Sequence, residues 1–357
     1  MILGALLALI ALALSIATPA WILRRSSARR RRWVVCLSGA LGALAGLALA
    51  GEIQLRRLGE KPYQRSFPGQ FEDTPDGVYW AELDAELGWT GPRASPGTNP
   101  QGFRDPRDFA ALAPEPAKKR VLVLGDSFVA GSGVGADETV PALLEAELGP
   151  GWECFNLGVP GWGIDQMALA HRRYAPLLRP DWVVLAFIDD DVRRVIEAHR
   201  FYEHMEKPCF EVRDGRLQPQ DAPSRIERAC NELGRRSVLF GFLFRHACVW
   251  SEGRAVVAEF LAEIGRDARA NGRRLLVMRI PTRDELLPRA RVRRWVTSCE
   301  SAANAAGAMY LDPGAAIAAE ADWTERLYIA DGHMSAAGNA YLARNMAARL
   351  RAGSKAE

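Results

Sequence analysis

The chain has 357 residues, of which 48% are apolar, and a formal net charge of +3 at neutral pH. These values fit a globular protein of one or two domains. The positive charge comes from arginines near the N-terminus, so the remainder is close to neutral and shows no sign of nucleic-acid binding. The absence of C-x-x-C and H-E-x-x-H motifs leaves a metal site without support, and we expect no cofactor.

Two apolar runs, residues 2–23 and 33–51, open the chain, with six arginines between them. Each run has about 20 residues, enough at ~1.5 Å per residue to cross a hydrocarbon core. The arginines favour a cytoplasmic turn. We therefore predict a two-helix anchor over residues 1–51 in the inner membrane, with the rest of the protein facing the periplasm.

Other interpretations of the first run stay open. It could be a cleaved signal peptide, although its first nine residues carry no charged side chain. A buried core hairpin would have to accommodate the six arginines. In an oxidising compartment disulfides are expected among the cysteines, and Cys209 with Cys230 is the first candidate pair.

Short apolar runs alternate with amphipathic segments in the rest of the chain. The predicted strands are residues 121–124, 154–157, 182–188, 274–280 and 308–311. The predicted helices are residues 137–148, 165–178, 190–204, most of 224–250, 255–270, 284–305 and 335–350. The Asp-Gly pair within residues 211–217 predicts a small hairpin.

This alternation predicts an α/β fold in which helices cover both faces of a parallel sheet, a three-layer α/β/α arrangement of the flavodoxin-like kind. Residues 52–86 are expected to be a linker and residues 87–357 a single domain. Within it, residues 192–248 are longer than a simple crossover, so we expect an insertion that forms a lid or a substrate-side wall.

Two motifs carry the predicted chemistry. Gly125-Asp126-Ser127 follows a buried strand, which places a serine hydroxyl at the carboxyl edge of the sheet. Asp331-Gly332-His333 stands between the last strand and the last helix, so it returns to the same edge. A serine nucleophile needs a base, and the base needs an orienting acid. Each motif alone is also typical of an ordinary turn.

Together with the segment from Asn156 to Gly161 and the acidic segment after residues 182–188, these motifs resemble the ordered blocks of SGNH (GDSL-type) hydrolases. Leu87-Gly88-Trp89 and the segment Asn99–Arg104 resemble the lead-in of membrane-bound members. The resemblance implies Ser127 as nucleophile, His333 as base and Asp331 as its partner. It also implies an oxyanion hole made by the N–H groups of Ser127 and Gly161 and by the side chain at Asp190.

The sequence departs from the family at Asp190, where an asparagine amide is expected. An ionised carboxylate repels an oxyanion, so three interpretations stay open. Asp190 is protonated, another donor replaces it, or turnover is slow or absent. Independently of these, one of Asp189, Asp190 and Asp191 is expected to cap the following helix.

Further candidates have weaker support. Residues 131–136 match a dinucleotide loop but begin too far past the strand. Ser132 is a fallback nucleophile. Trp162 is a candidate wall of the substrate pocket, although tryptophan is more often a core residue.

The expected reaction is cleavage of an acyl ester through an acyl-serine intermediate, with a cell-envelope glycan or lipid ester as substrate. A sugar hydroxyl as acceptor would instead give an O-acyltransferase. A scaffold or glycan-binding module that keeps the fold without catalysis is the third interpretation, and the altered residue at Asp190 is its support.

Overall fold

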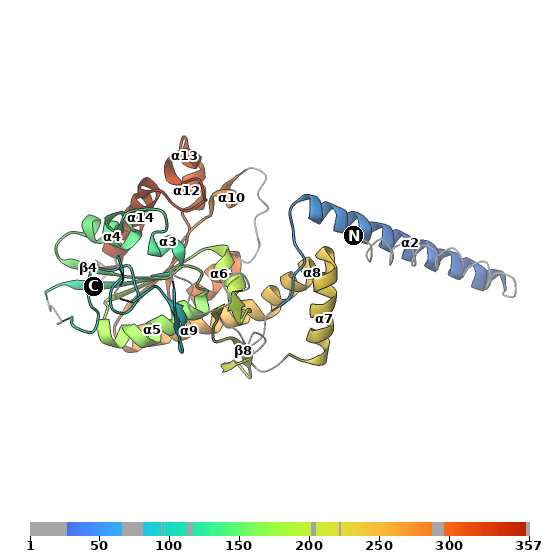
Figure 1. The fold of residues 1–357 in the computed structure, drawn as a ribbon, viewed down its shortest axis with the longest axis horizontal. Coiled ribbons are helices and arrows are strands. Elements are labelled where there is room, and N and C mark those ends of the chain that lie inside the picture. The colour runs from blue at the N-terminus through green and yellow to red at the C-terminus, as the bar shows by residue number, and fades with distance from the viewer. Residues whose placement is uncertain are drawn as a thin grey trace. The chain divides into compact units, whose positions relative to one another are not determined.

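The computed structural model describes residues 27–65, 81–93, 95, 97–112, 117–200, 205–220, 223–287 and 296–354. The chain divides into two compact units (Figure 1). Residues up to Arg65 form the first unit together with Pro223–Cys248, and the second unit contains Ser66–Ala222 and Val249–Glu357. Part of the predicted insertion therefore belongs to the unit of the N-terminal helix.

In the part of the first unit that the structure describes there are three helices, α2 (Ala28–Arg57), α7 (Arg225–Arg236) and α8 (Val238–Cys248). Within the described residues, α2 is long and apolar enough over Arg32–Arg57 to cross a membrane. The other apolar run, residues 2–23, lies outside the described residues. The predicted linker begins later than expected, because α2 continues to Arg57.

Glycines allow the close packing of α7 and α8 around Tyr63. The Tyr63 N–H donates to the Gly234 carbonyl at 3.2 Å. A Cβ at Gly234 would lie 2.3 Å from the Tyr63 carbonyl oxygen, and one at Gly241 would lie 2.7 Å from the Tyr63 nitrogen. A larger residue at either position would push the backbone away, so the small residues fix this contact.

The second unit is built on a parallel five-stranded sheet with the order β11-β10-β5-β3-β4. Its strands are β3 (Lys119–Gly125), β4 (Trp152–Gly158), β5 (Trp182–Phe187), β10 (Arg274–Arg279) and β11 (Met309–Leu311). Every residue of β5 is buried, as both faces of a parallel sheet must be. All five predicted strands are confirmed.

Helices cover both faces of this sheet. Figure 1 shows α4 (Val140–Leu148) and α14 (Ala336–Ser354) on one side, and α5 (Ile164–Leu178) and α9 (Arg254–Ala270) on the other. The predicted three-layer α/β/α fold is therefore confirmed. The remaining helices are α3 (Ser127–Ala130), η1 (Ala136–Glu138), α6 (Asp189–Arg194), η2 (Val249–Gly253), α10 (Arg283–Leu286), α11 (Val296–Ala305), α12 (Gly314–Ala318) and α13 (Trp323–Leu327).

Three small antiparallel pairs complete the second unit. They are β1 (Glu82–Asp84) with β2 (Gly88–Thr90), β6 (His199–Arg200) with β7 (Met205–Glu206), and β8 (Phe210–Arg213) with β9 (Arg216–Pro219). The predicted hairpin is confirmed, and both turn residues, Asp214 and Gly215, have positive φ as a tight hairpin requires.

Two predictions in this region are wrong. The helix predicted over residues 190–204 ends at Arg194, and the chain then continues into β6, which pairs with β7. The expected pairing of Cys209 with Cys230 is not formed, since all six cysteines are free thiols. The Sγ atom of Cys209 instead lies 2.8 Å from the Gln220 side-chain oxygen.

Candidate active site

Ser127 is the first residue of α3, directly after the sharp turn that ends β3. The Asp126 carboxylate caps this helix by accepting the Phe128 N–H at 2.9 Å. The turn needs glycine on both sides, because a Cβ at Gly125 would lie 2.2 Å from the Val129 side chain and one at Gly158 would lie 2.3 Å from the Ala130 nitrogen. The serine is thus held by backbone packing at the carboxyl edge of the sheet.

His333 meets Ser127 across a gap of 206 positions in the sequence, with 2.9 Å between its Nε2 atom and the serine Oγ. The loop that carries it is closed by an Ile329 N–H bond to the His333 carbonyl at 2.9 Å. The Phe128 ring lies 4.9 Å from the imidazole, centroid to centroid, and supports it from the side. The distance allows proton transfer between hydroxyl and ring.

Asp331 lies on the other side of the imidazole. Its Oδ2 is 3.1 Å from His333 Nδ1, close enough for an ion pair once the ring is protonated, although the alignment falls short of a hydrogen bond. Its Oδ1 accepts the His333 N–H at 3.0 Å, and this bond is the main reason that the pKa of Asp331 is lowered. The carboxylate is 60% exposed, so water weakens its hold on the ring.

Gly161 lies in the turn after β4, the neighbour of β3 in the sheet. The Val159 N–H donates to the Gly125 carbonyl at 3.2 Å, which joins this turn to the nucleophile turn. Gly161 has φ of +83°, a conformation that favours glycine. Its predicted place in the oxyanion hole stays a prediction.

Asp190 is held by two arginines. Its carboxylate accepts bonds from Arg193 at 2.7 and 3.0 Å and lies 3.2 Å from an Arg194 nitrogen. Both oxygens of the Asp190 carboxylate are thus bound by guanidinium groups. Its predicted place in the oxyanion hole stays a prediction.

The N-cap of α6 is Ile188 rather than one of the three aspartates, and Asp191, in the first turn, reaches back to accept the Ile188 N–H on its Oδ2 at 2.9 Å. Asp191 is also part of a buried charge cluster with Asp126 and Arg194. Burial, together with the neighbouring Asp126, raises the pKa of Asp191, and Arg194 opposes this rise.

Arg194 joins all three loops around the nucleophile. Its Nη1 donates to Asp126 at 3.2 Å, to the Trp162 carbonyl at 2.8 Å and to Asp191. Sequence reasoning missed this residue. The sequence did hold a signal, because Arg194 follows Asp191 by three positions and Asp190 by four. Side chains at these spacings lie next to each other on a helix.

The interpretation of Trp162 as a pocket wall is wrong. Its side chain is fully buried, and its indole N–H donates to the Trp89 carbonyl at 2.9 Å. The Trp89 indole in turn donates to the Pro160 carbonyl at 3.0 Å. These contacts therefore join the Gly161 turn to β2, and neither of the two buried side chains has a surface to offer a substrate.

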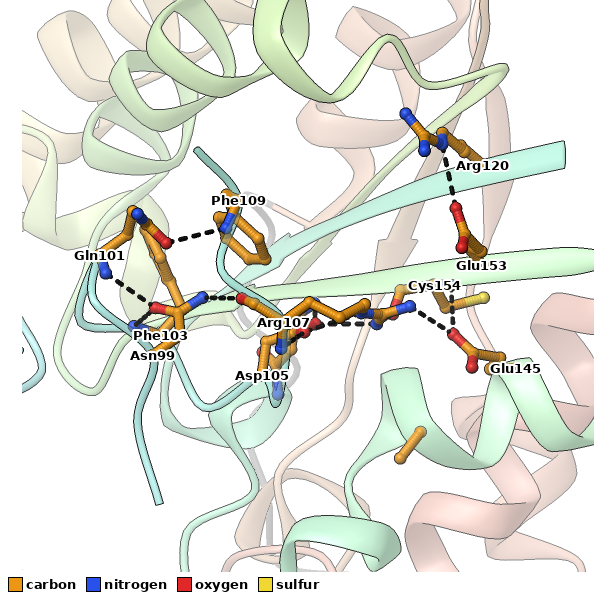
Figure 2. Close-up of polar contacts among 12 residues, drawn as sticks. Asn99, Gln101, Phe103, Asp105, Arg107, Phe109, Arg120, Glu145, Glu153 and Cys154 are labelled. Carbon is orange, nitrogen blue, oxygen red and sulfur yellow. Dashed lines mark hydrogen bonds and ion pairs between the residues drawn. The ribbon is translucent and has the colours of Figure 1, made fainter. Parts of the chain in front are cut away.

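Residues 97–112, which contain the Asn99–Arg104 part of the lead-in, form a segment that covers the outer edge of β4 (Figure 2). The Asn156 N–H donates to the Asp105 carboxylate at 3.0 Å, and the Cys154 N–H donates to Glu145 at 2.7 Å. Arg107 lies between both acids, 2.8 Å from Asp105 and 2.9 Å from Glu145, and also donates to the Cys154 carbonyl. Side chains thus satisfy backbone groups that a further strand would otherwise take.

Arg104, in the same segment, binds the loop that follows the nucleophile helix. Its guanidinium donates to the carbonyls of Ala130 at 3.4 Å, Val134 at 2.6 Å, and Gly131. This loop also contacts the loop that carries His333. The Ile329 side chain packs against Gly133, where a Cβ would lie only 2.3 Å from it. A chain of contacts therefore runs from Arg104 to the backbone that holds His333.

We expect Arg104→Met to lower kcat for hydrolysis of a simple aryl ester by about 10- to 100-fold, because small displacements of reacting groups have effects of this size. KM should change little, since no binding group is removed. Arg107→Met is the matched control, because it removes a guanidinium from the same segment without touching the loop. Equal losses of kcat in the two variants would contradict this role.

The three-layer α/β/α fold, with a serine hydroxyl next to an imidazole at the carboxyl edge of its parallel sheet, is the arrangement of an SGNH-type hydrolase. Residues 123–341 match the model of the GDSL-like lipase/acylhydrolase family. The chain belongs to this family, and general acylhydrolase or esterase activity follows from that membership.

Three solved structures illustrate what the structural comparison found. TesA shares 17% identity, with 64% of this chain and 95% of that chain covered and a TM-score of 0.40. A lipase/acylhydrolase from Enterococcus faecalis shares 15% identity over 66% and 96% of the two chains, with a TM-score of 0.41. A GDSL-like lipase from Bacteroides thetaiotaomicron shares 17% over 70% and 95%, with a TM-score of 0.40. The comparison with curated proteins found no match.

Proposed function

We propose that Ser127 cleaves acyl esters through an acyl-serine intermediate, and the 2.9 Å contact with His333 carries this proposal. As Oγ bonds to the acyl carbon, Nε2 takes its proton. The tetrahedral intermediate then collapses, and His333 gives the proton to the departing alcohol. Water attacks the acyl-serine while His333 takes a proton from it, and the return of that proton to Oγ releases the carboxylic acid and free serine.

The developing oxyanion needs hydrogen-bond donors, each of which typically contributes ~10²–10³ in rate. We assign this task to the N–H groups of Ser127 and Gly161. Asp190 is left out, because its carboxylate is bound by Arg193 and Arg194. These arginines neutralise a charge that would otherwise oppose the oxyanion.

A fluorophosphonate probe tests the nucleophile directly, because it forms a covalent bond only with an activated serine. We expect labelling of the full-length protein and its loss in Ser127→Ala. Ser132→Ala is the control, since Ser132 lies in the adjacent loop and should leave labelling intact. Labelling that persists in Ser127→Ala and disappears in Ser132→Ala would assign the nucleophile to the second serine.

Asp190→Asn restores the amide typical of the family. We expect unchanged or higher esterase activity, because a donor replaces a carboxylate that is now held by arginines. The same assay on Glu197→Gln, which removes the other acid bound by Arg193, separates a direct effect from a change in that arginine. A collapse in activity of Asp190→Asn alone would show that the carboxylate has a positive role.

We further propose that the chain is anchored in the inner membrane by two spans and that its hydrolase unit faces the periplasm. The apolar run at residues 33–51, which lies in α2, and the six arginines at residues 24–32 that precede this run support the placement. The corresponding substrate is an acyl ester of an envelope glycan or lipid, with water as acceptor. Acyl transfer to an added sugar, measured beside release of free acid from the same donor, would instead identify a transferase.

A further inference from the structure

Exposed apolar side chains are concentrated in the first unit. In α2 they include Leu41, Leu44 and Leu47, with exposed fractions of 56–70%, as expected for a membrane span. Outside α2 the same unit also exposes Leu58 (58%), directly after that helix, Ile226 (77%) and Leu233 (50%) on α7, and Leu243 (55%) on α8. Exposed apolar side chains that gather in one place mark a surface that contacts a membrane or another protein.

The start of α8 is fixed to the end of the apolar run of α2. Glu52 accepts the N–H groups of Val238 at 3.1 Å and Leu239 at 2.8 Å, and the Ser237 hydroxyl at 2.9 Å. Next to it, a Cβ at Gly51 would lie 3.4 Å from the Leu239 side chain. Because the apolar run ends at residue 51, α8 begins at the depth where a span would leave the hydrocarbon.

The composition of α8 suits that depth. Residues 238–244 are all apolar and include Phe240, Phe242 and Phe244, each only partly buried. The helix has 11 residues, which at ~1.5 Å per residue is too short to cross a bilayer. Aromatic and aliphatic side chains on a short helix are typical of helices that lie in the membrane interface.

Helix α7 adds a second apolar edge with charged neighbours. It runs across the direction of α2 (Figure 1), so it would lie along a membrane surface that α2 crosses. Ile226 and Leu233 are two turns apart on one side of the helix. The exposed Arg225 and Arg228 lie near them and have the long stems that let a charged head reach phospholipid headgroups.

We propose that α8 and the apolar edge of α7 are embedded in the lipid interface, with phospholipid as their partner. This inference rests on the proposed membrane span of α2. Lipid is preferred to a second protein chain because the exposed side chains continue the surface of α2, of which none of the most apolar stretch is buried. Residues 223–248 would then attach the chain to the membrane surface instead of forming the predicted lid.

Site-specific photocrosslinking tests the proposal on the full-length protein in phospholipid nanodiscs. The photoreactive residue p-benzoylphenylalanine replaces Leu243 in α8 or Leu233 in α7. Leu44 in α2 reports on the span, and Leu177, a leucine in α5 that is 47% exposed, is the matched control on the hydrolase unit. Fluorophosphonate labelling of Ser127 selects the variants that fold. We expect phospholipid adducts, detected by mass spectrometry, at positions 243, 233 and 44 and none at 177.

The outcomes separate the two proposals. Adducts at Leu44 without any at Leu243 and Leu233 would overturn the interfacial role of α7 and α8 and leave the anchor intact. No lipid adduct at any of the three positions would overturn the membrane span as well. A covalent dimer through Leu243, or equal lipid labelling at Leu177, would also overturn the proposal.

Discussion

Ser127→Ala is expected to lower kcat/KM for ester hydrolysis by about 10⁴–10⁶-fold, and adding His333→Ala to it should cause almost no further loss. The two side chains act as one unit, since the imidazole activates the hydroxyl that lies 2.9 Å away. When either is missing, the other has nothing to act on. Steady-state kinetics of the two single variants and the double variant measure this coupling.

The control for this experiment is His246→Ala. His246 lies on α8 and its ring is already bound to the Phe242 carbonyl, so its loss should leave kcat/KM nearly unchanged. If the losses of Ser127→Ala and His333→Ala instead multiply in the double variant, the two residues work independently. The base would then have to be sought elsewhere.

Arg194→Met is expected to lower the free energy of unfolding by about 3–5 kcal/mol, because it leaves buried carboxylates without their counter-charge. Asp126 and Asp191 have side chains that are only 1% and 0% exposed. Arg193→Met is the matched control, since the neighbouring arginine is 25% exposed and its pairs lie nearer the surface. Its loss should be below ~1 kcal/mol. Urea unfolding of the full-length protein, followed by tryptophan fluorescence, provides the comparison.

A double variant sharpens this test. Asp191→Asn removes one buried charge, so combined with Arg194→Met it should recover part of the lost stability, whereas two unrelated substitutions would add their losses. If Arg194→Met and Arg193→Met lower the free energy of unfolding equally, the buried cluster contributes no more to stability than the ion pairs of Arg193.

The sequence was most informative where local pattern and tertiary structure agree. Each buried strand is a short apolar run in the sequence, so the five strands, the parallel sheet and the placement of Ser127 and His333 at one edge were predictable. The Asp214-Gly215 hairpin was predictable for a local reason, because both residues tolerate positive φ.

What stayed hidden depends on contacts between distant segments. Nothing local shows that Arg104 binds carbonyls some 30 positions away, or that Arg194 bridges loops from three strands. The position of Trp162 was predicted wrongly, because the sequence alone does not show whether a tryptophan near a site motif faces the substrate or the core. The end of α6 was misplaced because the pairing of β6 with β7 takes residues 199–200 out of the predicted helix, and such pairing outweighs helical propensity.

The shielded edge of β4 has a consequence for how such a molecule coexists with its copies. A chain anchored as proposed meets neighbours by diffusion in a plane, where encounters are frequent and orientations restricted. An edge strand with unpaired backbone groups could then pair with a strand of a neighbouring copy and cause aggregation. Asp105 and Glu145 already occupy the outward N–H groups of Asn156 and Cys154. The catalytic unit is thereby suited to crowding at a surface.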